Sequence, residues 1–118
     1  MQNKIYVHPK CSTCKKALDF LKQHQIDVAV IDILENPPSV DDLMKALIQE
    51  KKLTKILNTS GKLYQAIESK EAFFALDPIE ILKSMNKSPM LIKRPFFVSD
   101  KGLLVGFNTG EWNRFFSK

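Results

Sequence analysis

The chain has 118 residues, of which 44% are hydrophobic and 26% charged, and its 18 basic and 13 acidic residues give a net charge of +5. This length predicts a single domain over residues 1–118 with its own core, and the composition excludes disordered and collagen-like chains. No apolar run approaches the roughly 18 residues of a membrane span, and the N-terminus has no long apolar stretch, so we expect a cytoplasmic protein without membrane contact. All but two of the basic residues are lysines spread along the chain, a pattern that does not favour direct nucleic-acid binding.

The first 34 residues predict a strand, a helix and a second strand. Lys4–Val7 is a short β-prone run, and Ser12–His24 repeats apolar residues at helical spacing. Val28–Leu34 is nearly continuous in β-branched and apolar residues, which predicts a strand covered on both faces. Strand, helix and strand at this length indicate a βαβ unit with parallel strands.

The middle of the chain, about residues 36–89, reads as helical. Ser39 with Asp42 three residues later is typical of a helix start, and apolar residues then repeat at helical spacing over residues 40–48. Asn58–Gly61 interrupts the pattern, and Asp77 followed by Pro78 predicts the start of another helix.

The last part of the chain returns to strands. Two apolar runs, Phe96–Val98 and Leu103–Phe107, flank a turn over residues 99–102 and predict a β-hairpin, after which Thr109 is expected to cap a final helix. The order βαβ, helices, ββα predicts an α/β, thioredoxin-like fold. It has a mixed four-stranded sheet and a helical insertion between its two halves.

The only two cysteines, Cys11 and Cys14, form a C-x-x-C sequence where the first strand gives way to the first helix. The partial positive charge of a helix N-terminus favours a thiolate there. We therefore expect Cys11 to be the exposed nucleophile and Cys14 the shielded thiol that resolves a mixed disulfide. Zinc would need two further ligands, and only His8 and His24 are available, so no metal is expected; two inert structural cysteines remain an alternative. His8 is either a base for Cys11 or a surface residue.

A second candidate feature is Arg94, which directly precedes Pro95 between two apolar runs. It is either a cation facing Cys11 or a surface arginine at a strand start. Lys93 either shares that anion site or is solvated. The candidate catalytic residues are therefore Cys11, Cys14 and Arg94, and the candidate substrate-binding residues are Ser12, Thr13, Asn58 and Pro95.

Four segments together resemble the arsenate reductase (ArsC)-like family, which includes the Spx and MgsR regulators. They are Tyr6–Cys14, Leu57–Gly61, Leu91–Phe96 and Leu104–Phe107. The resemblance implies a thioredoxin-like domain with a helical insertion, a nucleophilic cysteine at Cys11, an arginine at Arg94 and a cis peptide at Pro95.

The chain departs from the family's arsenate reductases, which use three arginines to hold the oxyanion. Only Arg94 matches; Asn58 and the Val105–Phe107 segment stand where the other two would fall, and Arg114 is outside the pattern. Each missing charge-assisted hydrogen bond would cost roughly 1.5–3 kcal/mol. The resemblance is therefore greatest to the arsenate reductase-like thiol reductases, which share Asn-Thr-x-Gly and Lys-Arg-Pro.

Three functions follow as expectations. The first is a thiol-disulfide oxidoreductase that acts on a thiol or disulfide substrate, is linked to glutathione or thioredoxin, and has no bound cofactor. The second is a redox-sensing regulator of the Spx and MgsR type that binds the RNA polymerase α C-terminal domain. The segment from Ser39 to Leu57 lacks the glycine turn that Spx uses at its partner surface. The third is an arsenate reductase.

Overall fold

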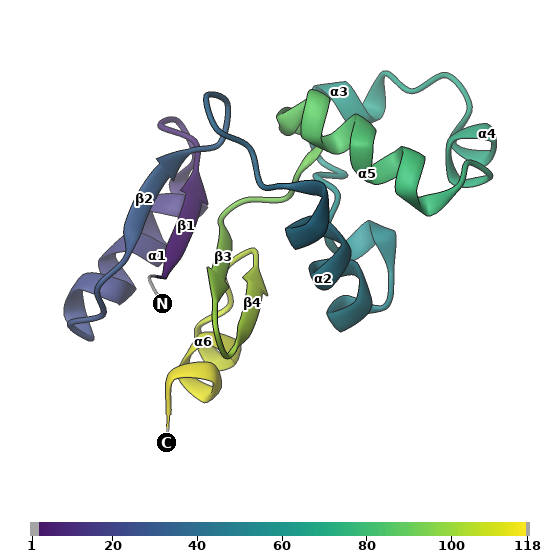
Figure 1. Cartoon of the computed structure of the whole chain (residues 1–118). Coiled ribbons are helices and arrows are strands. Elements are labelled where there is room, and N and C mark those ends of the chain that lie inside the picture. Colours follow the sequence, from purple (N-terminus) through teal and green to yellow (C-terminus); the bar gives the residue numbers. More distant parts are fainter. Residues whose placement is uncertain (1–2, 118) are drawn as a thin grey trace.

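The computed structural model describes residues 3–117 and contains one mixed sheet with the strand order β2-β1-β3-β4 (Figure 1). Strand β1 is parallel to β2 and antiparallel to β3, which forms an antiparallel hairpin with β4. This arrangement confirms the mixed four-stranded sheet built from a βαβ and a ββα half. The strands are β1 (Lys4–Val7), β2 (Ala29–Asp32), β3 (Phe96–Ser99) and β4 (Gly102–Val105).

One face of the sheet is covered by α1 (Ser12–Gln23) and α6 (Thr109–Phe116). Side chains alternate between the two faces along each strand, so that Ile5 of β1 and Phe97 of β3 point toward these helices. They pack with Trp112 of α6, which is fully buried and whose indole Nε1–H donates a hydrogen bond to the Gly106 carbonyl at 3.1 Å. The last helix is therefore held against the end of β4.

The opposite face packs against the inserted helices, which form a lobe beside the sheet in Figure 1. Tyr6, Phe96 and Leu103 of the sheet share a core with Leu43 and Leu82 of the insertion. The inserted elements are α2 (Val40–Glu50), the 3₁₀ turn η1 (Leu53–Lys55), α3 (Lys62–Gln65), α4 (Lys70–Phe74), α5 (Pro78–Lys87) and the 3₁₀ turn η2 (Pro89–Leu91).

The predicted starts of two inserted helices are confirmed. The Ser39 hydroxyl accepts a hydrogen bond from the Asp42 N–H at 3.0 Å, and the Asp77 carboxylate accepts one from the Ile79 N–H at 2.9 Å. Each cap satisfies a backbone donor that has no partner within its own helix. These caps fix where α2 and α5 begin.

Gln49, in the last turn of α2, joins the insertion to the free edge of the sheet. Its side-chain amide donates to the Leu103 carbonyl at 2.6 Å and accepts from the Leu103 N–H at 3.1 Å. The amide thus pairs with β4 as a neighbouring strand would, and it holds the C-terminal end of α2 in place.

Two sequence predictions need correction. The second strand is shorter than Val28–Leu34 and lies at the sheet edge, where Val30 is 56% exposed, so it is not covered on both faces. The final helix is capped by Asn108, whose side-chain oxygen accepts the Glu111 N–H at 2.9 Å, and Thr109 is instead its first residue. In both cases the local sequence is compatible with two structures, and only the tertiary contacts decide between them.

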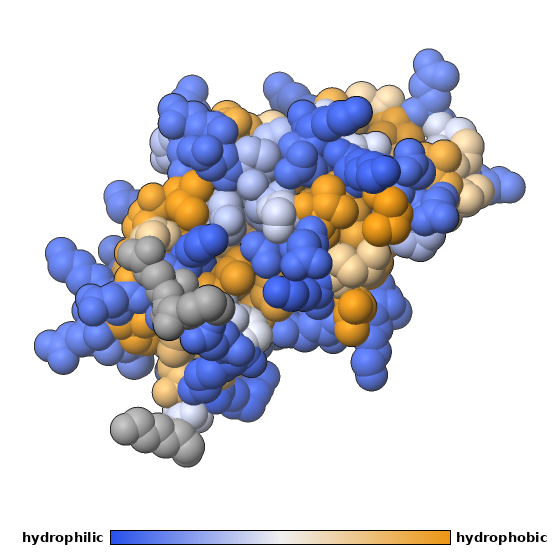
Figure 2. Space-filling view, viewed as in Figure 1, coloured by the Kyte–Doolittle hydropathy of each residue, from blue (hydrophilic) through white to orange (hydrophobic). Residues whose placement is uncertain are grey.

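Hydrophilic side chains cover most of the face shown in Figure 2, with apolar patches between them. Within residues 3–117, no helix combines the length and apolar character needed to cross a membrane.

Candidate functional site

Cys11 is the N-cap residue of α1, so its side chain lies at the positive end of a twelve-residue helix. Its Sγ accepts a hydrogen bond from the Cys14 N–H at 3.2 Å, and its own N–H donates to the His8 carbonyl at 3.1 Å. The Cys11 sulfur therefore faces a backbone donor and the positive end of the helix dipole. The short turn after β1 creates this position.

Cys14 lies one turn into α1 and is only 2% exposed, whereas Cys11 is half-buried. Burial and, as a smaller contribution, the hydrogen bond with Cys11 together raise the pKa of the Cys14 thiol to about 12. The backbone of His8 and the charge of Arg94 act in the opposite direction on this pKa. The order of exposure agrees with the expectation for a nucleophile and a shielded partner, while the two roles remain predictions.

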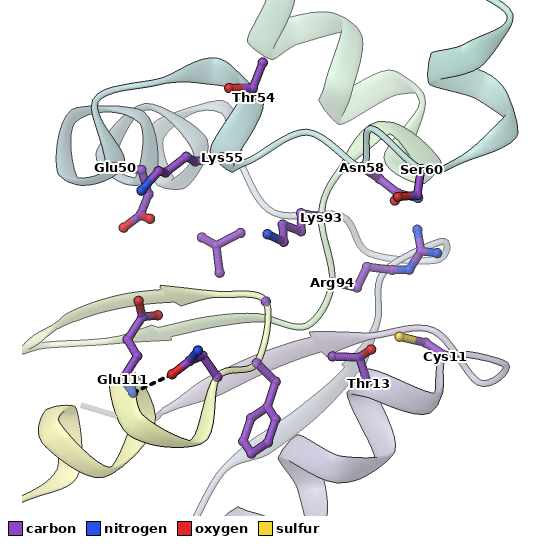
Figure 3. Close-up of a pocket in the computed structure, with 14 residues that line it drawn as sticks. Cys11, Thr13, Glu50, Thr54, Lys55, Asn58, Ser60, Lys93, Arg94 and Glu111 are labelled. Carbon is purple, nitrogen blue, oxygen red and sulfur yellow. Dashed lines mark hydrogen bonds between the residues drawn. The ribbon is translucent and has the colours of Figure 1, made fainter.

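Cys11 opens onto a cleft of about 650 Å³ between the sheet and the insertion (Figure 3). Six parts of the chain line the cleft. They are the start of α1, the end of α2, η1, the segment after η1, the segment before β3, and the stretch from the end of β4 to the first turn of α6. Its lining residues are Cys11, Thr13, Glu50, Thr54, Lys55, Asn58, Ser60, Lys93, Arg94, Val105, Gly106, Phe107, Asn108 and Glu111.

Arg94 reaches this cleft from the segment before β3, and its peptide bond to Pro95 is cis, as the family resemblance implied. Arg94 is half-buried as a residue, and its Nη1–H donates to the Met90 sulfur at 3.9 Å. Its Nε atom is buried and has no hydrogen-bond partner among the described residues. Arg94 therefore keeps hydrogen-bonding capacity for an anion in the cleft.

Lys93 also lines the cleft, and its side chain crosses over Gly106. Gly106 has φ +76°, and a Cβ atom at this position would lie 2.9 Å from the Lys93 Cε. The absence of a side chain thus lets Lys93 pass over the backbone here.

The structure brings Thr13 and Asn58 together with Cys11 and Arg94 on the cleft. Asn58 also donates through Nδ2 to the Met90 carbonyl at 3.4 Å. By contrast, Ser12 lines a second hollow of about 440 Å³ that also contacts Cys11. Pro95 is buried and does not line the cleft, although its carbonyl accepts the Gly106 N–H at 2.8 Å.

His8 lines the second hollow, beside Cys11 and Cys14. Its Nδ1 accepts a hydrogen bond from the Lys10 N–H at 3.1 Å, which fixes the ring against the loop. Among residues 3–117, no group of three or more His, Cys, Asp or Glu side chains is placed to hold a metal ion.

Sequence reasoning missed three charged residues of the cleft, namely Glu50, Lys55 and Glu111. Two come from the end of α2 and from η1, and the third comes from the first turn of α6. No local motif marks them, because only the packing of the insertion against the sheet brings these segments together.

The chain is similar to known proteins in sequence and in fold. The uncharacterised protein YusI of Bacillus subtilis (strain 168) is 36% identical over 110 residues, which are 92% of each chain. The global transcriptional regulator Spx of the same organism is 30% identical over 112 residues, covering 94% of this chain and 84% of Spx. The crystal structure of a possible arsenate reductase from Streptococcus mutans UA159 superposes with a TM-score of 0.84 at 32% identity, covering 95% of this chain and 98% of the other.

The family model for the ArsC family matches residues 6–115, nearly the whole chain, and includes both cysteines and Arg94. The chain therefore belongs to the ArsC family.

Proposed function

We propose that the protein is a thiol-disulfide reductase in which Cys11 is the nucleophile and Cys14 the resolving thiol. The observation that carries the proposal is the contrast between the two cysteines. Cys11 accepts a backbone N–H at a helix start and opens onto a cleft, while Cys14 is buried one turn away. Residues in this relation suit a reaction in two steps, in which only the first thiol needs to reach the substrate.

In the first step, the Cys11 thiolate attacks one sulfur of a substrate disulfide. A bond forms between Cys11 and that sulfur, the substrate S–S bond breaks, and the other half leaves as a thiolate that takes up a proton. Arg94 lies on the same cleft and would stabilise negative charge on sulfur or on a substrate carboxylate.

In the second step, Cys14 loses its proton and attacks Cys11, which releases the second half of the substrate as a thiolate. The protein is left with a Cys11–Cys14 disulfide, and the substrate has gained two electrons and two protons. An external thiol must return those electrons; glutathione or a thioredoxin-type dithiol are the candidate donors. Such a cycle suits a reducing compartment, and we place the protein in the cytoplasm.

Substitution of Cys14 by serine tests this scheme. Cys14→Ser should accumulate a stable mixed disulfide on Cys11 when treated with glutathione disulfide, because nothing resolves it. The unmodified chain should instead lose two hydrogens and carry no adduct, as measured by intact mass spectrometry. Cys11→Ser is the matched control and should form no adduct. A lasting adduct on the unmodified chain, or one carried by Cys14, would contradict the assigned roles.

A redox-controlled transcriptional regulator is the second candidate, and the similarity to Spx over 94% of the chain favours it. In that case, oxidation of Cys11 and Cys14 would change binding to the RNA polymerase α C-terminal domain. A pull-down with that domain, using reduced and oxidised protein, separates the two proposals. Binding that depends on oxidation would favour the regulator, while substrate turnover without such binding would favour the reductase.

Arsenate reduction is the third candidate, since one structural neighbour is described as a possible arsenate reductase. Arg94 is the one arginine that lines the cleft, and Arg114 lines a different hollow. A tetrahedral oxyanion needs several charged donors, so we expect little arsenate turnover with a glutathione–glutaredoxin or thioredoxin donor. Robust turnover by the unmodified protein would replace the reductase proposal with this one.

A further inference from the structure

Met90 is the residue that holds the side chain of Arg94 at the edge of the cleft. Its sulfur accepts a hydrogen bond from Arg94 Nη1 at 3.9 Å, and among residues 3–117 the guanidinium forms no other hydrogen bond. In Figure 3 the Arg94 side chain runs toward Asn58 and Ser60, and its guanidinium points away from Cys11. Because a thioether sulfur is a weak acceptor, this contact leaves the guanidinium free to turn toward an anion.

The backbone at Met90 is fixed, so the sulfur stays within reach of Arg94. Met90 is the middle residue of η2, and its carbonyl accepts a hydrogen bond from Asn58 Nδ2 at 3.4 Å. The carbonyl of the next residue, Leu91, accepts one from the Asn58 N–H at 2.8 Å. Both contacts tie the turn to the segment after η1, and they place the Met90 side chain beside the part of the cleft wall that Asn58 and Arg94 form.

Met90 is also accessible to a small oxidant. It is 37% exposed and lines a hollow of about 470 Å³ that adjoins the cleft at Asn58. By contrast, Met85 is fully buried, and Met44 packs against the core of the insertion. Exposure governs how readily a sulfur is oxidised, so among the methionines of residues 3–117 we expect Met90 to react first with peroxide.

Oxidation would change the acceptor that Arg94 meets. The thioether sulfur donates an electron pair to one oxygen of hydrogen peroxide, the O–O bond breaks, an S–O bond forms, and the second oxygen leaves as water with the proton of the first. The sulfur loses two electrons and the peroxide gains them. The product, methionine sulfoxide, is polar, and its oxygen accepts hydrogen bonds. A charge-assisted N–H···O bond is about 2.7–2.9 Å long, so an oxygen on the sulfur fits between it and Arg94 Nη1, which are 3.9 Å apart.

The charge of Arg94 reaches the two thiols. Arg94 and Cys11 line the same cleft, and the charge of Arg94 opposes the rise that burial causes in the pKa of Cys14. The Arg94 Nε atom is buried and has no hydrogen-bond partner in the described part of the chain, so the group has capacity for an anion near Cys11. A sulfoxide oxygen would compete for that capacity, because a guanidinium bound to a strong acceptor is less available to an approaching carboxylate or thiolate.

We propose that Met90 is a site of oxidation by peroxide, and that its sulfoxide oxygen binds Arg94 and thereby weakens the attraction of the Cys11 site for anionic reactants. The protein would then respond to an oxidant through a residue other than its two cysteines. This inference goes beyond the proposed reductase function and does not depend on it, since it requires only that Arg94 attract anions near Cys11.

The test measures how Cys11 discriminates between an anionic and a neutral reagent. Rate constants for iodoacetate and iodoacetamide are measured by peptide mass spectrometry, and their ratio reports the attraction of Arg94 for the carboxylate. Before treatment with hydrogen peroxide, Cys11 is blocked as a methyl disulfide; dithiothreitol afterwards restores the thiols and leaves the sulfoxide in place. Oxidation of Met90 should lower the ratio about two- to fivefold, the range expected for one partly exposed ion pair.

Three variants show whether the effect passes from Met90 to Arg94. Met90→Leu removes the reactive sulfur and keeps the other methionines, so peroxide should leave its ratio unchanged. Arg94→Ala should have the low ratio before treatment and should not respond to peroxide. Met90→Gln brings an amide oxygen within reach of Arg94 without oxidation, so the untreated variant should have the low ratio, whereas untreated Met90→Leu should not.

The contrary outcomes are equally specific. A ratio that stays constant once mass spectrometry shows the sulfoxide at Met90 would overturn the proposal. An equal fall in Met90→Leu or in Arg94→Ala would also overturn it, because the effect would then not pass from one residue to the other. Preferential oxidation of Met44 or Met85 would remove Met90 as the site. Substrate turnover is not measured, so failure of the reductase scheme would leave these results unchanged.

Discussion

Substitution of Cys11 by serine isolates Cys14 and tests the environment that the fold gives to the second thiol. Burial and the contact with Cys11 raise the pKa of Cys14 from 9.0 to about 12. Alkylation proceeds through the thiolate, so its rate follows the ionised fraction. At pH 8, a pKa of 9 leaves about one thiol in ten ionised, and a pKa of 12 leaves about one in ten thousand.

The variant removes the part of this effect that Cys11 supplies and keeps the larger part, which comes from burial. We therefore expect folded Cys11→Ser to react with iodoacetamide at least about a hundredfold more slowly than the same chain in denaturant. Physical shielding adds to this difference, since Cys14 is 2% exposed.

The assay measures alkylation of Cys14 over time by peptide mass spectrometry, in buffer and in guanidinium chloride at the same pH. The denatured sample is an internal control for the intrinsic reactivity of the thiol. If Cys14 in the folded variant reacts within about tenfold of the denatured rate, then burial does not suppress its ionisation, and the division of roles between the two cysteines loses its physical basis.

Three further predictions follow from the site and its supports. Release of thiol from a mixed disulfide on Cys11 should accelerate as pH rises from 7 to 9, because the raised pKa leaves Cys14 mostly protonated and more of it ionises at higher pH. A release rate that does not change with pH, measured by stopped flow, would contradict this. Arg94→Ala should slow alkylation of Cys11 near pH 7, whereas Arg114→Ala, outside the cleft, should not; equal rates in both variants would exclude Arg94 as a partner of the thiolate. Gln49→Ala should lower the free energy of unfolding by about 1–3 kcal/mol through the loss of two hydrogen bonds, and an unchanged urea midpoint would show that they contribute nothing.

Much of the fold could be predicted because its signals are local. A short β-prone run marks β1, two apolar runs around a turn mark the β3–β4 hairpin, and the caps at Ser39 and Asp77 mark helix starts. The predicted strand Val28–Leu34 failed in length and burial, because a run of β-branched residues is equally compatible with an edge strand. Its position in the sheet depends on the order of strands, which the run itself does not encode.

The candidate site, like the fold, could be predicted from the sequence only in part. The relation between Cys11 and Cys14 follows from three residues of helix, so sequence spacing was sufficient to predict it. The position of Arg94 before Pro95 already suggested a cation facing Cys11, and the family resemblance supported Arg94 and added Asn58. Glu50 and Glu111 could not be found by either route, because they line one cleft only when α2 and α6 are both packed on the sheet.

The two parts of the chain contribute differently to the cleft. The thioredoxin-like part supplies Cys11 and Arg94, while the insertion supplies one wall, including Glu50, Lys55 and Asn58. The hydrogen bonds between Gln49 and β4 fix the end of α2, and Glu50 is the next residue along the chain. Loss of this contact should therefore alter the position of a cleft carboxylate as well as stability. The packing that holds the end of α2 against β4 therefore also sets one wall of the cleft onto which Cys11 opens.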